Sequence, residues 1–429
     1  MSRIDLLTKF TVKVEGGSGC LFQPINDEYS YVLTAKHVII DNNAPSIIRQ
    51  YLDENGNLIN ETLEIIEEPY RHSDNNKDAA IIKVKKIGII EILLRNEILP
   101  ENKDGYFLCG HPNSRRNQND SFRLDEITIL QTKQHNYRES KSKQPIIYDE
   151  VIGQSGGGIL KVEDSCILLA GIQSKMAAED GKETLGRLVF MPLSFYDEII
   201  AENEDELSKL FPPYIGSFER LLNDIFPLGG IQVTSAKKTL IQNELKVIAK
   251  NLCEEFTPQK IIEIYKDSLL VSGTDIGLIN HKALWISFLE LLSINQLHNE
   301  QKITLNELKN IHKSKKLYFT DSKEWIFKLE DIYRSDLSEV EKGGLIVIGS
   351  TFDTKPTTIE LDKGFIGDIC TVPNKEMYIN NTVTEPFNDL TIVHIFKFQK
   401  HVIDNYREFT AITAANSLQK IKDVTKGVI

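Results

Sequence analysis

Three short segments near the start of this chain constrain its fold more than any other feature. They read VLTAKH at 32–37, DAAIIK at 78–83 and GQSGGG at 153–158. The first two join apolar, strand-like residues to a polar residue at a strand end, and the third is a glycine-rich turn. The three segments place a histidine, an aspartate and a serine in that order along the chain. The chain must therefore fold as short strands and tight turns around three polar residues.

The residue types in these segments favour acyl-transfer chemistry. A serine such as Ser155 is a poor nucleophile at neutral pH, so a neighbouring base must take its proton. His37 suits that role because an unperturbed histidine has a pKa of about 6.5. A carboxylate such as Asp78 orients the imidazole and stabilises its charged form. The glycines beside Ser155 permit a tight turn that points backbone N–H groups at one spot.

Several segments carry a resemblance to a known family over about residues 8–200. They are GSGCLF at 17–22, LTAKH at 33–37, DAAII at 78–82, GQSGG at 153–157, LLAGIQS at 168–174 and FMPL at 190–193. In these the sequence resembles the trypsin-like, chymotrypsin-fold serine protease superfamily. The resemblance implies that His37 is the general base, Asp78 its orienting acid and Ser155 the nucleophile. It also implies that the amides of Gly153 and Ser155 form the oxyanion hole.

The sequence departs from the digestive members of that family at two informative positions. Gln154 stands where those enzymes carry an aspartate that pairs with a freed N-terminus, and no RIVGG activation site precedes Gly16. Val38 replaces the frequent cysteine after the histidine, so that disulfide is missing. The sequence is therefore more similar to the non-zymogen bacterial branch, which includes the heat-shock proteases.

Two nearby residues are rivals for catalytic roles. His72 is a rival base and Asp74 a rival acid, but both lie in the polar run 71–77, which predicts a solvated loop. An apolar strand follows Asp78 immediately, which favours Asp78 as the acid.

The resemblance also implies a substrate pocket. Its floor lies six residues before the nucleophile, at Asp149, where a carboxylate favours Lys or Arg in the substrate. Gln173 and Ser174 lie on the strand that would pair with substrate, and Lys175 could reach in and neutralise the pocket. An exposed acidic turn is the alternative interpretation of Asp149.

Composition excludes several classes of protein. The chain has 429 residues, and its net charge of −12 disfavours nucleic acid as a direct ligand, because coating nucleic acid needs a basic face. No apolar run is long enough to predict a membrane span or a signal peptide. Cys20, Cys109 and Cys166 lie in apolar runs without zinc-type spacing. We therefore expect free thiols, a cytoplasmic location, no membrane partner and no metal or cofactor.

Two sets of short apolar runs predict an all-β N-terminal part. The runs lie at 10–14, 20–22, 29–34, 63–67 and 79–84, and then at 106–110, 124–131, 146–148, 158–162, 166–174 and 185–191. We expect two β-barrels at about 8–98 and 104–200. His37 and Asp78 belong to the first barrel and Ser155 to the second, so the active site would lie in the crevice between them.

Beyond about residue 202 the pattern becomes helical. Apolar residues recur every three or four positions in 235–254, 258–271 and 275–298, a capping box begins at Thr304, and 321–335 is a further helix candidate. After Gly343 strand-like runs at 345–349 and 390–398 precede a helix at 398–424. His394, within the second run, is expected to be a core residue. The sequence thus predicts three parts, a protease-like part at 1–200, a helical part at 201–340 and a small α/β unit at 341–429.

More than half of the chain carries no catalytic motif. We expect this part to recruit a protein or ligand activator that gates a serine endopeptidase acting on specific protein targets. The layout is similar to bacterial effectors in which a trypsin-like domain is fused to a signalling or adaptor domain, including those of antiviral defence. Two other interpretations stay open, a pseudoprotease that serves as an adaptor binding module, and a broad quality-control protease.

Overall fold

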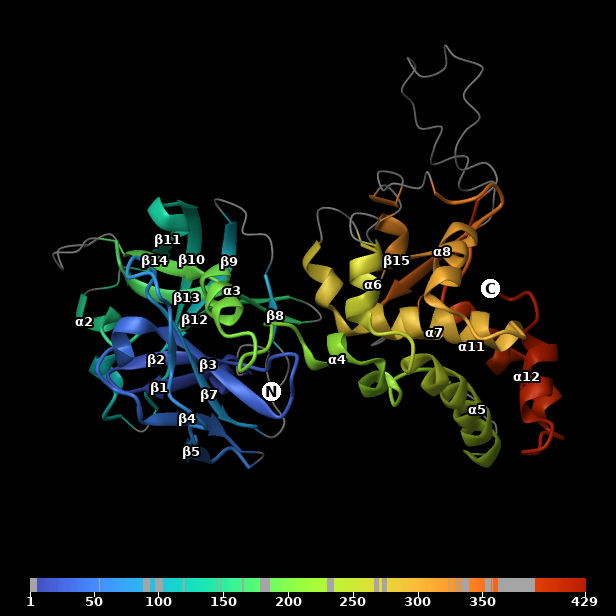
Figure 1. Ribbon diagram of the computed structural model, residues 1–429, viewed down its shortest axis with the longest axis horizontal. Coiled ribbons are helices and arrows are strands. Elements are labelled where there is room, and N and C mark those ends of the chain that lie inside the picture. The colour runs from blue at the N-terminus through green and yellow to red at the C-terminus, as the bar shows by residue number, and fades with distance from the viewer. Residues whose placement is uncertain are drawn as a thin grey trace, which may run out of the picture. The chain divides into compact units, whose positions relative to one another are not determined.

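The computed structural model divides the chain into two compact units, Met1–Pro213 and Tyr214–Ile429 (Figure 1). It describes residues 6–53, 55–87, 93–96, 103–118, 120–144, 146, 148–163, 166–177, 186–229, 235–265, 270–271, 276–322, 324–328, 331–332, 339–351, 356, 358–361 and 390–429.

The first unit begins with a seven-stranded antiparallel sheet in the order β5-β4-β1-β2-β3-β7-β6. Its strands are β1 (Thr11–Val14), β2 (Gly17–Phe22), β3 (Tyr29–Ala35), β4 (Ile47–Leu52), β5 (Leu58–Thr62), β6 (Tyr70–Arg71) and β7 (Ala79–Lys85). Residues 63–66 bridge the sheet, because Leu63 N donates to Ile47 O at the start of β4 while Ile66 N donates to Lys83 O on β7. The sheet therefore curls around a core that includes Val12, Val32 and Ile82.

The second sheet of this unit closes on itself. It contains β9 (Lys103–Gly110), β10 (Arg123–Thr132), β11 (Arg138–Ser142), β12 (Gly158–Val162), β13 (Ile167–Met176) and β14 (Arg187–Pro192), with β8 (Leu93–Arg95) parallel to β13. The order β12-β9-β10-β11-β14-β13 is completed by pairing of β12 with β13, which makes a closed six-stranded barrel. Closure leaves these six strands no free edge.

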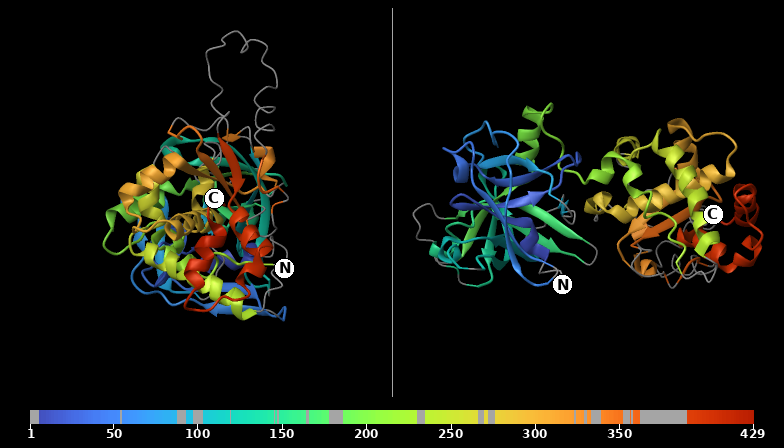
Figure 2. Two further views of the ribbon diagram at one scale, coloured as in Figure 1. Left: turned by 90° about the vertical axis from the view of Figure 1, so that its right-hand side faces the viewer. Right: turned by 90° about the horizontal axis from the view of Figure 1, so that it is seen from below.

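Together the two sheets form the chymotrypsin-like fold expected from the sequence. Figure 2 shows the blue strands of the first sheet and the green strands of the second as two neighbouring β structures. A shared apolar core lies between them and includes Leu33 of β3, Leu169 of β13 and Phe195 of helix α3 (Ser194–Glu202). This arrangement brings the end of β3 close to the loops of the closed barrel.

Two expected strands are wrong. The run at 63–67 forms only an isolated bridge, between Ile65 and Val84. In place of a strand at 146–148 the structure has helix α2 (Tyr148–Val151), which begins at Tyr148, and the neighbouring strand is β11 at 138–142. The observed strand, RESKS, carries no apolar residue, yet Glu139, Ser140 and Ser142 are buried in it. Pairing with β10 and β14 compensates for weak intrinsic strand propensity.

The second unit packs helices on a small parallel sheet in the order β15-β16-β17. The strands are β15 (Lys315–Thr320), β16 (Leu345–Ser350) and β17 (Thr391–His394). Among the described residues its α-helices include α4 (Pro213–Gly216), α5 (Ser235–Cys253), α6 (Pro258–Tyr265), α7 (Lys282–His298), α8 (Leu305–Ser314), α11 (Phe396–Asp404) and α12 (Ser417–Thr425). Helix α7 contacts α5, β15 and β16, and 13 of its 17 residues are buried, so it is the central helix of this unit (Figure 1).

Several local expectations for this unit are confirmed. Helix α6 begins at Pro258, and Thr304 caps α8 in a capping box with Glu307. His394 is buried and its Nε2 lies 2.9 Å from Ser350 Oγ. The expected limit between residues 340 and 341 falls inside one compact unit, because β15 before that limit pairs with β16 after it.

No helix in the described part of the chain is long and apolar enough to span a bilayer.

Candidate active site

The ends of two neighbouring strands bring His37 and Asp78 together. Ala35 at the end of β3 pairs with Ala79 at the start of β7, so the residues just outside the ladder meet. Asp78 Oδ1 accepts the backbone N–H of His37 at 2.9 Å, and Asp78 Oδ2 lies 2.8 Å from His37 Nδ1. The carboxylate therefore fixes both the position of the backbone and the orientation of the ring.

Two residues of the closed barrel hold Asp78 in turn. Ser174 Oγ donates to Asp78 Oδ2 at 2.7 Å, and the backbone N–H of Asp78 donates to the hydroxyl of Tyr137 at 2.9 Å. Burial alone would raise the pKa of Asp78, but the hydrogen bonds from His37 and Ser174 outweigh it and hold that pKa below its usual value. Asp78 is thus ionised at neutral pH and connects both sheets of the unit.

Ser155 lies in a glycine loop that packs closely against both sheets. Its carbonyl accepts the N–H of Ser18 at 2.7 Å, and the next amide, of Gly156, donates to Gln173 O at 2.7 Å. Gly156 has φ +88°, and a Cβ there would lie 1.9 Å from Ser18 O, so a side chain cannot be accommodated. The loop therefore needs glycine at this position for both backbone conformation and close approach.

A pocket of about 420 Å³ joins the expected catalytic groups. His37 and Ser155 both line it, and so do Gly153 and Ser174. His37 is half-exposed, so its ring is accessible from the pocket. Among the described residues no hydrogen bond joins Ser155 Oγ to His37, and none is made by the amides of Gly153 or Ser155. His37, Gly153 and Ser155 therefore all border one pocket.

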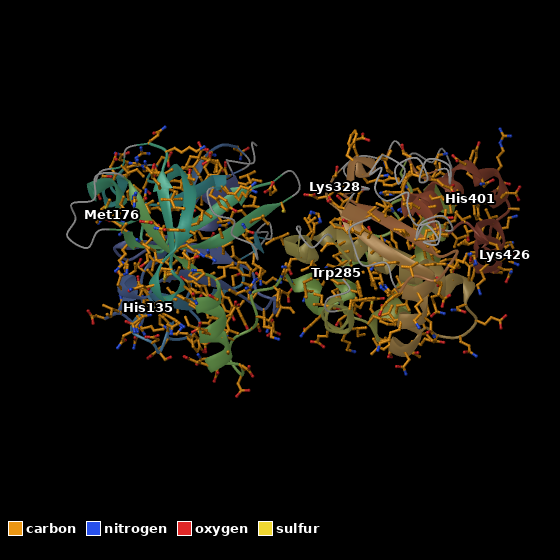
Figure 3. All side chains as sticks on the ribbon, turned by 90° about the horizontal axis from the view of Figure 1, so that it is seen from above. His135, Met176, Trp285, Lys328, His401 and Lys426 are labelled. Atoms are coloured by element: carbon orange, nitrogen blue, oxygen red, sulfur yellow. The ribbon has the colours of Figure 1, made fainter. Side chains whose placement is uncertain are left out.

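The expected substrate-binding residues occupy different environments. Ser174 and Lys175 line the pocket, together with the apolar side chains of Val38, Val151, Ile152 and Met176. Met176, labelled in Figure 3, is the last residue of β13. Gln173 is fully buried, and its backbone binds the glycine loop through Gly156 and Gly157. The side chain of Asp149 lies outside the described residues.

The rivals for the catalytic roles have structural partners elsewhere. His72 Nε2 lies 3.0 Å from Glu198 Oε2 of α3, and His72 Nδ1 accepts the N–H of Asp74. His72 is buried, so the expectation of a solvated histidine is wrong, because the ring packs edge-on against Phe195. Asp74 stabilises its own turn by accepting hydrogen bonds from Asn76.

Some residues around the site carry no signal in the sequence. Tyr137 follows a short polar turn, yet its hydroxyl holds Asp78 and donates to Asn76 O. Ser18 donates from Oγ to Gly153 O at 2.6 Å, although in the sequence it stands out only as part of the GSGCLF segment. These contacts join segments more than 50 residues apart, so no local pattern could indicate them.

The comparisons with solved structures match the chain to serine proteases. A serine endoprotease from Yersinia pestis is 20% identical, with 47% of this chain and 66% of that chain covered, at a TM-score of 0.33. This chain thus spans just under two thirds of the Yersinia protein. The Rv3671c protease of M. tuberculosis, in an inactive form, is 14% identical, with 47% and 90% covered, at a TM-score of 0.33. No curated protein matches the sequence.

A family model matches the other part of the chain. Residues 190–404, just over half of the chain, match C-terminal domain 4 of the ABC-three component (ABC-3C) systems. The match begins at the last strand of the closed barrel and ends with α11. It therefore covers most of the unit that the sequence left without a resemblance of its own. By this match the chain belongs to the family of proteins that carry C-terminal domain 4 of the ABC-3C systems.

Proposed function

We propose that the first unit is a serine endopeptidase that uses Ser155, His37 and Asp78 through an acyl-enzyme. One observation carries the proposal. Asp78 holds the Nδ1 side of His37 at 2.8 Å, and His37 shares a pocket of about 420 Å³ with Ser155. A neutral imidazole oriented in this way keeps the lone pair of Nε2 for a proton from the nucleophile.

In the first half of the proposed reaction Ser155 Oγ attacks the carbonyl carbon of a peptide bond. His37 Nε2 takes the hydroxyl proton, and the carbonyl oxygen becomes an oxyanion that the amides of Gly153 and Ser155 stabilise. The intermediate then collapses, the C–N bond breaks, and His37 gives its proton to the leaving amine. Ser155 is left as an acyl ester, and Asp78 stays ionised throughout.

In the second half water replaces the amine. His37 Nε2 takes a proton from water as the water oxygen attacks the ester carbonyl of Ser155. Collapse of the second intermediate breaks the C–O bond to Ser155 and returns the proton to its hydroxyl. The products are a carboxylic acid and the free enzyme, so the cycle needs no cofactor from outside the chain.

Labelling with a fluorophosphonate probe tests this proposal directly. The full chain should be labelled on Ser155 and Ser155→Ala should not be. A matched control is Ser46→Ala, since Ser46 is exposed and lies outside the pocket, and this variant should be labelled like the wild type. Failure of the wild type to react would favour a non-catalytic binding module instead.

We further propose that the second unit regulates the first and recruits a partner. The matched family is named for three-component systems, which supports an assembly with other proteins. In this proposal a partner or ligand bound to the second unit gates a cytoplasmic peptidase, as in a bacterial defence effector with few protein targets. Equal cleavage by the full chain and by residues 1–213, with and without extract of host cells, would contradict gating.

The range of targets separates an effector from a quality-control protease. New protein termini in cells that carry wild type or Ser155→Ala identify the substrates. Cuts in one or a few folded proteins support the effector, whereas cuts in many unfolded proteins support quality control.

A further inference from the structure

Gln154, directly before the proposed nucleophile, is tied to the closed barrel by its side chain. It is fully buried, and its Nε2 donates to Asp125 Oδ2 of β10 at 3.0 Å. Its Oε1 has no hydrogen-bond partner within the described ranges, so the side chain is held by the hydrogen bond from Nε2. This hydrogen bond fixes the orientation of the buried side-chain amide. It thereby also restricts the position of the Gln154 backbone.

Asp125 is itself held by a partly buried arginine, Arg123. Arg123, two residues earlier on the same face of β10, donates from Nε to both carboxylate oxygens of Asp125 at 2.9 Å. Arg123 is 11% exposed and Asp125 6%, so this ion pair lies in a largely dry environment. The amide of Gln154 thus binds a carboxylate whose position is fixed by a second charge.

The same arginine reaches the other end of the glycine loop. Arg123 Nη1 lies 2.8 Å from Glu150 Oε1 on α2, four residues before Gln154. Burial would lower the pKa of Arg123, but the contacts with Glu150 and Asp125 outweigh burial and raise it. Arg123 and Asp125 of β10 therefore bind both ends of the segment 150–154, Arg123 through Glu150 and Asp125 through Gln154.

Two backbone contacts set the peptide planes between these ends. The N–H of Asn113 donates to Ile152 O at 2.8 Å, and Ser18 Oγ donates to Gly153 O at 2.6 Å. In a trans peptide the C=O and the following N–H point in opposite directions. The N–H of Gly153 is therefore turned away from Asn113, and Gly153 itself lines the pocket.

We propose that Gln154, Asp125 and Arg123 are positioning residues that hold the 150–155 segment so that the amides of Gly153 and Ser155 face the reacting carbonyl. This inference rests on the proposed peptidase function, since it assigns the support of that same site. Loss of one well-placed oxyanion donor typically costs roughly 10²–10³ in turnover. If one of these amides is no longer held in place, kcat is expected to fall at least about tenfold. KM should change little, because the oxyanion exists only after attack.

The test compares variants of the full chain that change this network. Gln154→Met removes the donor at similar volume. Gln131→Met is the matched control, because Gln131 also lies on β10 and its Nε2 binds Glu139, outside the pocket lining. The double variant Gln154→Glu with Asp125→Asn reverses the direction of the hydrogen bond, so the new amide donates to the new carboxylate.

Two readouts are needed. The first readout is kcat and KM for hydrolysis of an ester substrate, with kcat expressed per active site titrated by the fluorophosphonate. The second readout is hydrogen exchange of peptides that cover residues 148–157. Gln154→Met should lose at least about tenfold in kcat per titrated site with KM within twofold, and its exchange should rise over 148–157. Gln131→Met should change neither, and the double variant should recover most of kcat.

Specific results would overturn the inference. Unchanged kcat per titrated site in Gln154→Met, with fewer sites titrated, would show a role in stability alone. Unchanged exchange over 148–157 would show that the network does not hold the loop. If the wild type does not react with the fluorophosphonate, the peptidase proposal is overturned. The hydrogen-exchange measurement would still decide whether Gln154 positions the loop.

Discussion

The carboxylate of Asp78 holds His37 at two points, through the backbone N–H at 2.9 Å and through ring Nδ1 at 2.8 Å. The ring therefore carries its proton on Nδ1 when neutral, and Nε2 faces no acceptor among the described residues. This relationship follows from strand pairing, because Ala35 and Ala79 are partners in the ladder of β3 and β7. A substitution of Asp78 should therefore lower the rate of the proposed reaction with little effect on substrate binding.

Asp78→Asn is expected to lower kcat by about 10⁴ with little change in KM. The asparagine oxygen can still accept the N–H of His37, but its amide would donate to Nδ1 and force the proton onto Nε2. Ester hydrolysis by the full chain measures the effect. Asp74→Asn, which changes the rival acid, should leave kcat unchanged, and a comparable loss there would contradict the assignment of Asp78.

Gly156→Ala should abolish most activity. A Cβ at Gly156 would lie 1.9 Å from Ser18 O, so the loop that carries Ser155 must move, and a displacement of about 1 Å costs on the order of 10² in rate. Gly56→Ala is the control, because Gly56 also has a positive φ but its Cβ would meet no atom. The control should lose about 1–2 kcal/mol of stability and no activity. Fluorophosphonate labelling and thermal unfolding measure both effects, and equal labelling of the two variants would contradict the close approach.

Lys175→Ala should raise kcat/KM for substrates with Lys or Arg at the cleaved position relative to matched Leu substrates. Lys175 lines the pocket, and removing a cation there relieves repulsion of about 1 kcal/mol, or roughly fivefold. Asp149→Asn should lower the same ratio if Asp149 selects basic residues as proposed. Reporter peptides that differ at one residue measure the ratio. Equal or reversed rates for Lys and Leu in the wild type would contradict a basic preference.

Glu290→Gln should remove a pH dependence from the stability of the second unit. Burial raises the pKa of Glu290 to about 8, although hydrogen bonds from Phe226 N and Gln399 Nε2 partly oppose it. Because the folded pKa exceeds the unfolded value of about 4.3, the contribution to stability is fully present below pH 4.3 and is lost as pH rises through 8. The wild type should therefore weaken over this range by a few kcal/mol, whereas the neutral glutamine should not.

Tryptophan fluorescence isolates this effect. Both tryptophans of the chain, Trp285 and Trp325, are buried in the second unit, so urea unfolding followed by fluorescence reports that unit alone. At pH 9 the variant should be the more stable protein. A parallel pH dependence in the two proteins would show that Glu290 does not titrate in this range.

Local sequence predicted the elements whose residues agree with their final environment. The alternating or continuous apolar runs of β3, β7 and β13 predicted strands, and Thr304 with Glu307 predicted the start of α8. It failed for β11, whose polar residues become a strand through their partners. It also failed to separate β15 from the helices around it, since KKLYFT has only three consecutive apolar residues, and so short a run fits either structure.

The sequence by itself determined the identity and order of the reactive groups, because a serine, a histidine and an aspartate have fixed chemistry wherever they lie. Only the tertiary structure decided where they lie, since His37 and Asp78 converge through a β ladder and Ser155, on a loop of the closed barrel, lines the same pocket as His37. The supports of the loop, Arg123, Asp125 and Gln154, were likewise decided by folding. The physical reason is distance, because hydrogen bonds act over about 3 Å in space and these partners are separated by tens of residues along the chain.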